Sequence, residues 1–175
     1  MNAFLMQSML HPVYALEHLL VLLALGLLCG QQGWQSIRWT VPSFALALAL
    51  GLVLTRFIPT PLQASLILLV ITALLGLLLT LKLSLAPAWV VVFTVPAGLL
   101  MGWDSALSFL PGMRLQTIYT GLIVIGLTAT LLLSVFAVCS LALNKLWSGL
   151  VVRVLGAWLA AAAIMVVALS VFGLA

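Results

Sequence analysis

Long apolar runs dominate the chain, and single charged residues, Pro, Gly and Trp divide them into six segments. Each segment comes close to the about 20 apolar residues that an α-helix needs to cross a bilayer. The runs lack the alternation of barrel strands. The pattern predicts an all-α, polytopic membrane protein, a bundle of six transmembrane helices in a single integral membrane domain over residues 1–175. The expected spans are residues 10–29, 37–57, 61–81, 86–103, 115–143 and 147–173.

The composition is too apolar for a soluble domain. Hydrophobic residues make up 66% of the chain and charged residues 5%, whereas a soluble domain carries about 25% charged residues. The few charges form no basic stripe, so nucleic-acid binding is excluded, as are collagen-like, coiled-coil and disordered structures. The two cysteines, Cys29 and Cys139, make no disulfide framework and are expected to be packing thiols.

Charge placement predicts an orientation. With six spans, one face of the bundle carries Arg38, Lys82, Lys145 and Arg153, and the other carries Arg56, Arg114 and both termini. The positive-inside rule therefore favours both termini outside and the richer face in the cytoplasm. The first residues lack the positive segment of a signal peptide, so the first span is expected to belong to the mature fold.

Small residues four positions apart predict close helix contacts, because they let backbones approach. Such pairs occur in the first, fourth and sixth expected spans, and they are Gly26 with Gly30, Gly98 with Gly102, and Gly156 with Ala160.

Ionisable side chains within the spans are the candidate chemistry, because they are costly in hydrocarbon. His18 lies about 700° and about 10.5 Å beyond His11 on a helix, so the two imidazoles share a face, with Glu17 about 100° away. Asp104, three residues after Met101, ends the fourth span at the same membrane face. Imidazole and carboxylate suit divalent nickel, cobalt or zinc, and a thioether favours copper(I).

These five residues, His11, Glu17, His18, Met101 and Asp104, form the expected metal site. An alternative interpretation needs no metal. In it, the two acids pair with Arg56 and Arg114 on the same face, and backbone carbonyls satisfy the histidines.

Three segments of the chain are similar to one family of small membrane proteins. "HPVYALEHLLVLLALGLL" resembles the H-P-x-x-G-x-D-H-L-L signature of the HupE/UreJ family, whose members are regarded as nickel or cobalt permeases. "VPSFALALALG" and "RVLGAWLAAAAIMVVAL" resemble the family's second and last helices. The family's fourth-helix motif F-H-G-x-A-H-G-x-E matches "PAGLLMGWD", where Ala97 and Met101 replace the two histidines and Asp104 the final acid.

The resemblance implies a secondary transporter for nickel or cobalt in a bacterial inner membrane, with copper or zinc as other candidate ions. The alternative is a membrane scaffold or accessory subunit that keeps the permease fold without transport, as the loss of two histidines suggests. An enzyme is disfavoured, because no H-E-x-x-H or comparable spacing occurs. No cofactor is required, and the expected partners are the metal ion, the lipid bilayer and, as further candidates, a second copy or another membrane protein.

Overall fold

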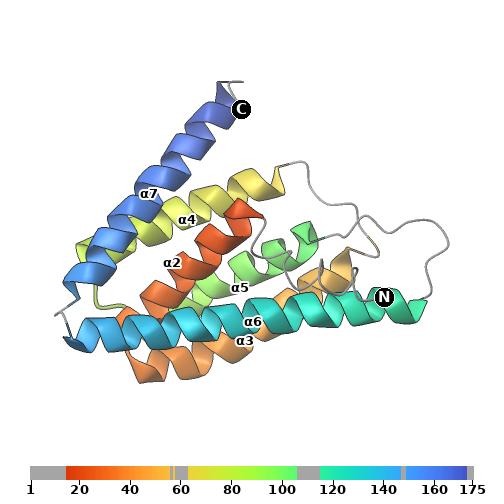
Figure 1. Ribbon diagram of the computed structural model, residues 1–175, viewed down its shortest axis with the longest axis horizontal. Coiled ribbons are helices and arrows are strands. Elements are labelled where there is room, and N and C mark those ends of the chain that lie inside the picture. The colour runs from red at the N-terminus through yellow and green to blue at the C-terminus, as the bar shows by residue number, and fades with distance from the viewer. Residues whose placement is uncertain (1–14, 56, 58–62, 106–114, 147–148, 173–175) are drawn as a thin grey trace.

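The structure is a computed structural model that describes residues 15–55, 57, 63–105, 115–146 and 149–172 (Figure 1). These residues form helices joined by turns and contain no strand. The all-helical prediction is therefore confirmed for the described part of the chain. In chain order the helices are α2 (Leu16–Gln32), α3 (Trp34–Leu54), α4 (Ala64–Leu81), α5 (Pro87–Asp104), α6 (Leu115–Leu146) and α7 (Leu150–Val171).

Five of these helices, α3 to α7, are long and apolar enough to cross a membrane. The prediction of six such spans needs correction at α2, which has 17 described residues and so a length of about 25 Å. Residues 10–14 of the expected first span lie outside the described residues. α3 begins three residues earlier than expected, because Gly33 alone makes the turn after α2, with a φ of 96° that favours glycine.

The central element of the bundle is α2, which contacts each of the five other helices (Figure 1). From Val21 to Gly30 its residues are buried, Leu23 apart. A helix that is apolar on every side needs apolar surroundings, either lipid or protein, and around α2 these surroundings are the other helices. The position of α2 therefore places its few polar residues deep in the molecule.

The most extensive helix contacts join α3 to α5, α4 to α7 and α2 to α6. All three contacts involve glycine, as the small-residue spacing predicted. A Cβ atom at Gly26 or Gly30 would meet α6, and one at Gly156 would meet α4. The backbones of paired helices thus approach closely enough that no side chain fits between them.

The closest approach between two helix backbones lies between α3 and α5. A Cβ atom at Gly51 would meet the carbonyl oxygen of Leu99, and one at Gly102 would meet that of Leu48. Backbone atoms cannot rotate away as side chains do, so this contact holds α5 in one position along α3. Two residues after Gly102, α5 ends at Asp104.

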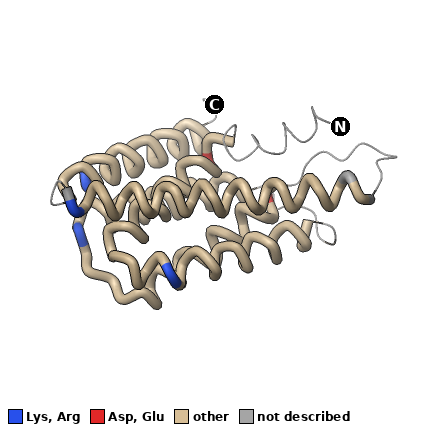
Figure 2. The backbone as a smooth tube through the Cα atoms, turned by 60° about the horizontal axis from the view of Figure 1, so that its bottom comes forward, with Lys and Arg blue, Asp and Glu red and all other residues tan. Residues whose placement is uncertain are grey.

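Charged residues separate along the length of the bundle (Figure 2). Glu17 and Asp104 lie on the side where α2 begins and α5 ends, which we call the acidic end. The opposite end, which we call the basic end, carries the described Lys and Arg residues Arg38, Lys82, Lys145 and Arg153. Because α2, α4 and α6 run from the acidic to the basic end, their negative helix C-termini meet these cations.

Side chains tie the helices together at the basic end. Gln31 Nε2 donates to the Leu79 carbonyl of α4, and Asn144 Nδ2 of α6 donates to the Gln31 carbonyl. Arg153 Nε of α7 donates to the Thr80 carbonyl over 3.0 Å. These bonds satisfy carbonyl groups at helix C-termini that have no partner within their own helix.

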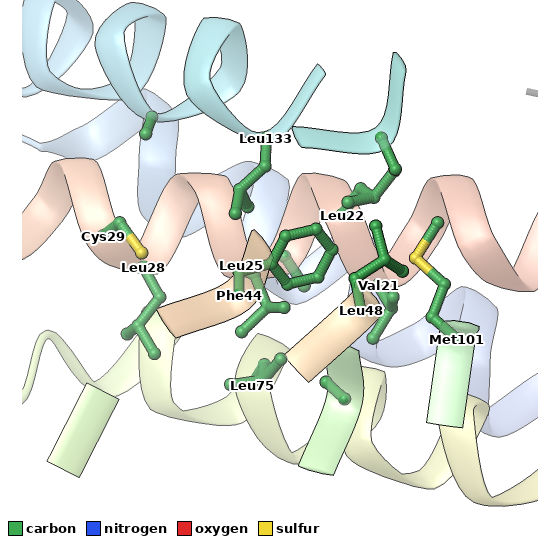
Figure 3. Close-up of a cluster of buried hydrophobic side chains, with 14 of the residues drawn as sticks. Val21, Leu22, Leu25, Leu28, Cys29, Phe44, Leu48, Leu75, Met101 and Leu133 are labelled. Carbon is green, nitrogen blue, oxygen red and sulfur yellow. The ribbon is translucent and has the colours of Figure 1, made fainter. Parts of the chain in front are cut away.

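An apolar layer fills the middle of the bundle between the two ends (Figure 3). Leu22 and Leu25 of α2 pack there with Phe44 and Leu48 of α3, and all four are fully buried. In Figure 3, Cys29 lies toward one end of this cluster and Met101 toward the other. The layer separates the polar groups of the acidic end from those of the basic end.

Candidate metal site

The candidate site consists of a histidine and a carboxylate at the acidic end. His18 Nε2 lies 3.2 Å from Asp104 Oδ2, a hydrogen-bonding distance between residues 86 positions apart in the chain. The His18 side chain is 1% exposed and that of Asp104 is 22% exposed. The carboxylate therefore forms the accessible edge of the pair and the imidazole its buried part.

Helix direction brings the two residues together. His18 is in the first turn of α2, and Asp104 is the last residue of α5, which runs the opposite way. The end of α5 is closed by Ser105, whose backbone N–H and hydroxyl both donate to the Met101 carbonyl. The expectation that the start of the first span and the end of the fourth meet at one face is confirmed by the 3.2 Å contact.

The other predicted site residues lie differently. Met101 is fully buried one turn before Asp104, close to Val21 of α2 (Figure 3). Glu17 is half-buried and makes no hydrogen bond or ion pair with any described residue. His11 lies outside the described residues, so its place in the site stays a prediction.

The alternative interpretation pairs the acids with Arg56 and Arg114, which lie outside the described residues, so this pairing stays a prediction. Among the described residues, the partner of Asp104 is His18. A histidine in contact with a carboxylate can act in two ways. Both groups can bind one metal ion, or the carboxylate can orient the imidazole while its other nitrogen binds.

Within the described ranges, no three His, Cys, Asp or Glu side chains come close enough to share a metal ion. The pair therefore supplies two ligand groups, and a complete coordination shell would need further donors. The candidates for these donors are water and three residues near the start of α2 or the end of α5 in sequence, namely Met101, Glu17 and His11.

The fold and the pair together define a class: a polytopic helical protein of the membrane with a buried imidazole–carboxylate contact at one end. A family model described as HupE / UreJ protein matches residues 1–166. The chain belongs to this family, as the first-span motif suggested. The family is associated with nickel and cobalt transport or accessory roles in bacterial membranes, and its members are not known as enzymes. No curated protein and no solved structure matches the chain.

Proposed function

We propose that the protein carries a divalent transition-metal ion, nickel or cobalt, across the bacterial inner membrane, with His18 and Asp104 among its ligands. The observation that carries the proposal is the 3.2 Å contact between the two side chains. An ionisable pair at membrane depth is costly, and such pairs commonly mark the path of an ion or proton. Membership of a family associated with nickel and cobalt supports this choice of ion.

The charge distribution supports one direction of transport. The described Lys and Arg residues gather at the basic end (Figure 2), which the positive-inside rule puts in the cytoplasm. The acidic end then faces outward and attracts cations. An arriving ion first meets Asp104, the more exposed member, and then the buried imidazole of His18. In this proposal Glu17, Met101 and His11 complete the coordination shell.

The side-chain bonds at the two ends suggest a way to open the site. The basic end is held by side-chain bonds among α2, α4, α6 and α7. At the acidic end, His18 bonds to Asp104 and so joins α2 to α5. A metal ion that took both groups as ligands would replace this bond. We infer that α2 and α5 then separate at the acidic end while the basic end stays closed.

A second candidate function is that of an accessory subunit that does not transport. Two observations favour it. No three-ligand group is present among the described residues, and Ala97 and Met101 stand where the family motif has histidines. In this case the His18–Asp104 pair is a structural link between α2 and α5, and a membrane partner carries the ion.

Metal accumulation in cells that express the wild type, His18→Ala or Asp104→Asn separates the two functions. The asparagine amide can still hydrogen-bond His18 but lacks the carboxylate charge that attracts and binds a cation. If the pair binds the transported ion, both variants lose accumulation by about tenfold or more, while the Asp104→Asn protein keeps its thermal stability. Glu17→Gln then shows whether the neighbouring acid belongs to the same site.

The control is a strain without the protein, measured with nickel, cobalt, copper and zinc at matched expression. Equal accumulation of all four ions in the control, wild-type and His18→Ala strains would end the transport proposal. Loss of stability in His18→Ala without any transport by the wild type would instead support the accessory subunit.

A further inference from the structure

A groove lies between α3 and α6, on the half of the bundle nearer the basic end. α3 packs most extensively on α5, and α6 packs most extensively on α2, so the line where α3 meets α6 is left partly open. The groove has a volume of about 550 Å³, and its lining includes Trp34, Arg38 and Pro42 of α3 with Ser134 and Val138 of α6. Both helices are long and apolar enough to cross the membrane, so the groove opens onto lipid.

A second groove continues the first toward the acidic end. It begins about one turn further on, at Ala45 of α3 and Thr130 of α6, and its lining is mostly apolar. One leaflet of the hydrocarbon core is about 15 Å thick, which corresponds to about ten residues of a helix. Counted from Arg38, that length of α3 ends between Ala45 and Ala49, which both line the second groove. The two grooves, which we call the α3–α6 seam, therefore provide an apolar path at least one leaflet long.

A cation lies where the seam reaches the basic end. Arg38 is exposed in the second turn of α3 and makes no hydrogen bond or ion pair with any described residue. Arg153 at the same end, by contrast, donates to the Thr80 carbonyl. Trp34 lies one turn before Arg38 and is exposed, and indole rings favour the headgroup level of a bilayer. The guanidinium of Arg38 can therefore reach the lipid headgroups while its stem follows the apolar wall.

We propose that the α3–α6 seam binds one anionic phospholipid of the leaflet at the basic end, with the phosphate on Arg38 and one acyl chain along the seam. A guanidinium binds a phosphate through two parallel, charge-assisted hydrogen bonds. The acyl chain fills a groove whose apolar walls offer water few partners. The positive charge of Arg38 favours an anionic headgroup such as phosphatidylglycerol over a zwitterionic one. The inference does not depend on the transported ion.

The position of the seam gives this lipid a structural consequence. The seam lies between two closely packed pairs of helices, α3 with α5 and α2 with α6. A lipid in the seam contacts both pairs and holds them together at the basic end. Because a ligand that binds only the folded state stabilises it, the lipid should raise the melting temperature of the protein in detergent.

Native mass spectrometry of the purified full-length protein, titrated with phosphatidylglycerol or phosphatidylcholine in detergent, tests the headgroup contact. We expect one phosphatidylglycerol to bind more tightly than phosphatidylcholine and to raise the melting temperature. Arg38→Gln should weaken this binding by about tenfold or more, because it removes charge-assisted hydrogen bonds. Lys145→Gln is the matched control. It removes a charge at the same end from a residue outside the lining of the seam, and it should weaken binding by about twofold or less, because a distant charge is screened by salt.

A second pair of variants tests the acyl chain. Val138→Trp fills the groove and keeps the charge of Arg38, whereas Val135→Trp places the same side chain at an exposed position of α6 outside the seam. We expect Val138→Trp alone to weaken phosphatidylglycerol binding, by about tenfold or more, which corresponds to the loss of two buried methylene groups. Inorganic phosphate at the same concentration should neither compete nor stabilise, because it has no chain.

Several results would overturn the lipid site. They are equal binding of the two lipids, equal effects of Arg38→Gln and Lys145→Gln, equal effects of the two tryptophan variants, and competition by inorganic phosphate. A wild-type dimer that Val138→Trp separates into monomers would show that a second copy of the chain occupies the seam instead.

Discussion

Replacing Gly51 by alanine tests whether the contact between α3 and α5 sets the position of Asp104. An added Cβ atom would lie 2.9 Å from the Trp103 nitrogen and 3.0 Å from the Gly102 Cα atom, whereas ordinary contacts are 3.4–4 Å. Both neighbours are backbone atoms, so the helices themselves must move. The Leu99 carbonyl oxygen is closer still, so restoring ordinary contacts requires α5 to retreat by about 1 Å or more.

The expected cost follows from two opposing terms. Overpacking of a tight contact costs about 1–3 kcal/mol, and the better helix propensity of alanine offsets up to about 1 kcal/mol. We expect the free energy of unfolding to fall by about 1–2 kcal/mol. The shift occurs two residues before Asp104 and is large enough to take its 3.2 Å contact with His18 out of hydrogen-bonding range. Metal accumulation should therefore fall as well.

Gly126→Ala is the matched control. It makes the same chemical change inside α6, but an added Cβ atom there would meet only Leu52 Cδ1, at 3.5 Å. We expect this variant to be as stable as the wild type or up to about 1 kcal/mol more stable. The assay is unfolding by titration with a denaturing detergent, together with metal accumulation in cells. Equal stability of the two variants, or a Gly51→Ala protein as stable and active as the wild type, would refute the reasoning.

Further predictions concern the basic end, the thiols and the ligands. Ser140→Ala removes a hydrogen bond to a backbone carbonyl of α2 and should lower the free energy of unfolding by about 0.6 kcal/mol. Ser170→Ala, which loses a bond within α7 at an exposed position, should have a smaller effect, and the opposite order would contradict the inter-helix role. In the folded protein, mass spectrometry should find Cys139 alkylated and the buried Cys29 protected; prompt labelling of both would contradict this packing. An impermeant maleimide should label Lys82→Cys from the cytoplasmic side, and labelling only from outside would reverse the orientation. Metal binding should weaken on acidification, because imidazole binds a metal only in its neutral form, and an affinity independent of pH would argue against a histidine ligand.

Several features of the fold could be predicted from residues alone because they depend on local properties. Continuous apolar runs set the number and type of the helices, and the expected end of the fourth span at residue 103 agrees within one residue with that of α5. The spacing of Gly98 and Gly102 correctly marked a close helix contact. Local signals were less exact at Gly33, where a one-residue turn lets α3 start before its expected position.

The candidate site could be predicted only in part. The meeting of His18 and Asp104 follows from helix direction, which the order of the spans determines. The sequence left open whether Asp104 pairs with an arginine. The place of Glu17 in the site stays a prediction, because Glu17 has no bond to any described residue.

By itself, the order of residues determined that this protein is a helical bundle of the membrane and placed it in its family, because span length, apolarity and a short motif are properties of contiguous residues. Only the tertiary structure decided which helix lies at the centre, which helices pair, and which polar groups meet. In water, the apolar face of a helix reveals the side that packs inward. In a bilayer, lipid and protein neighbours are equally apolar, so the sequence of a span does not say what each face contacts.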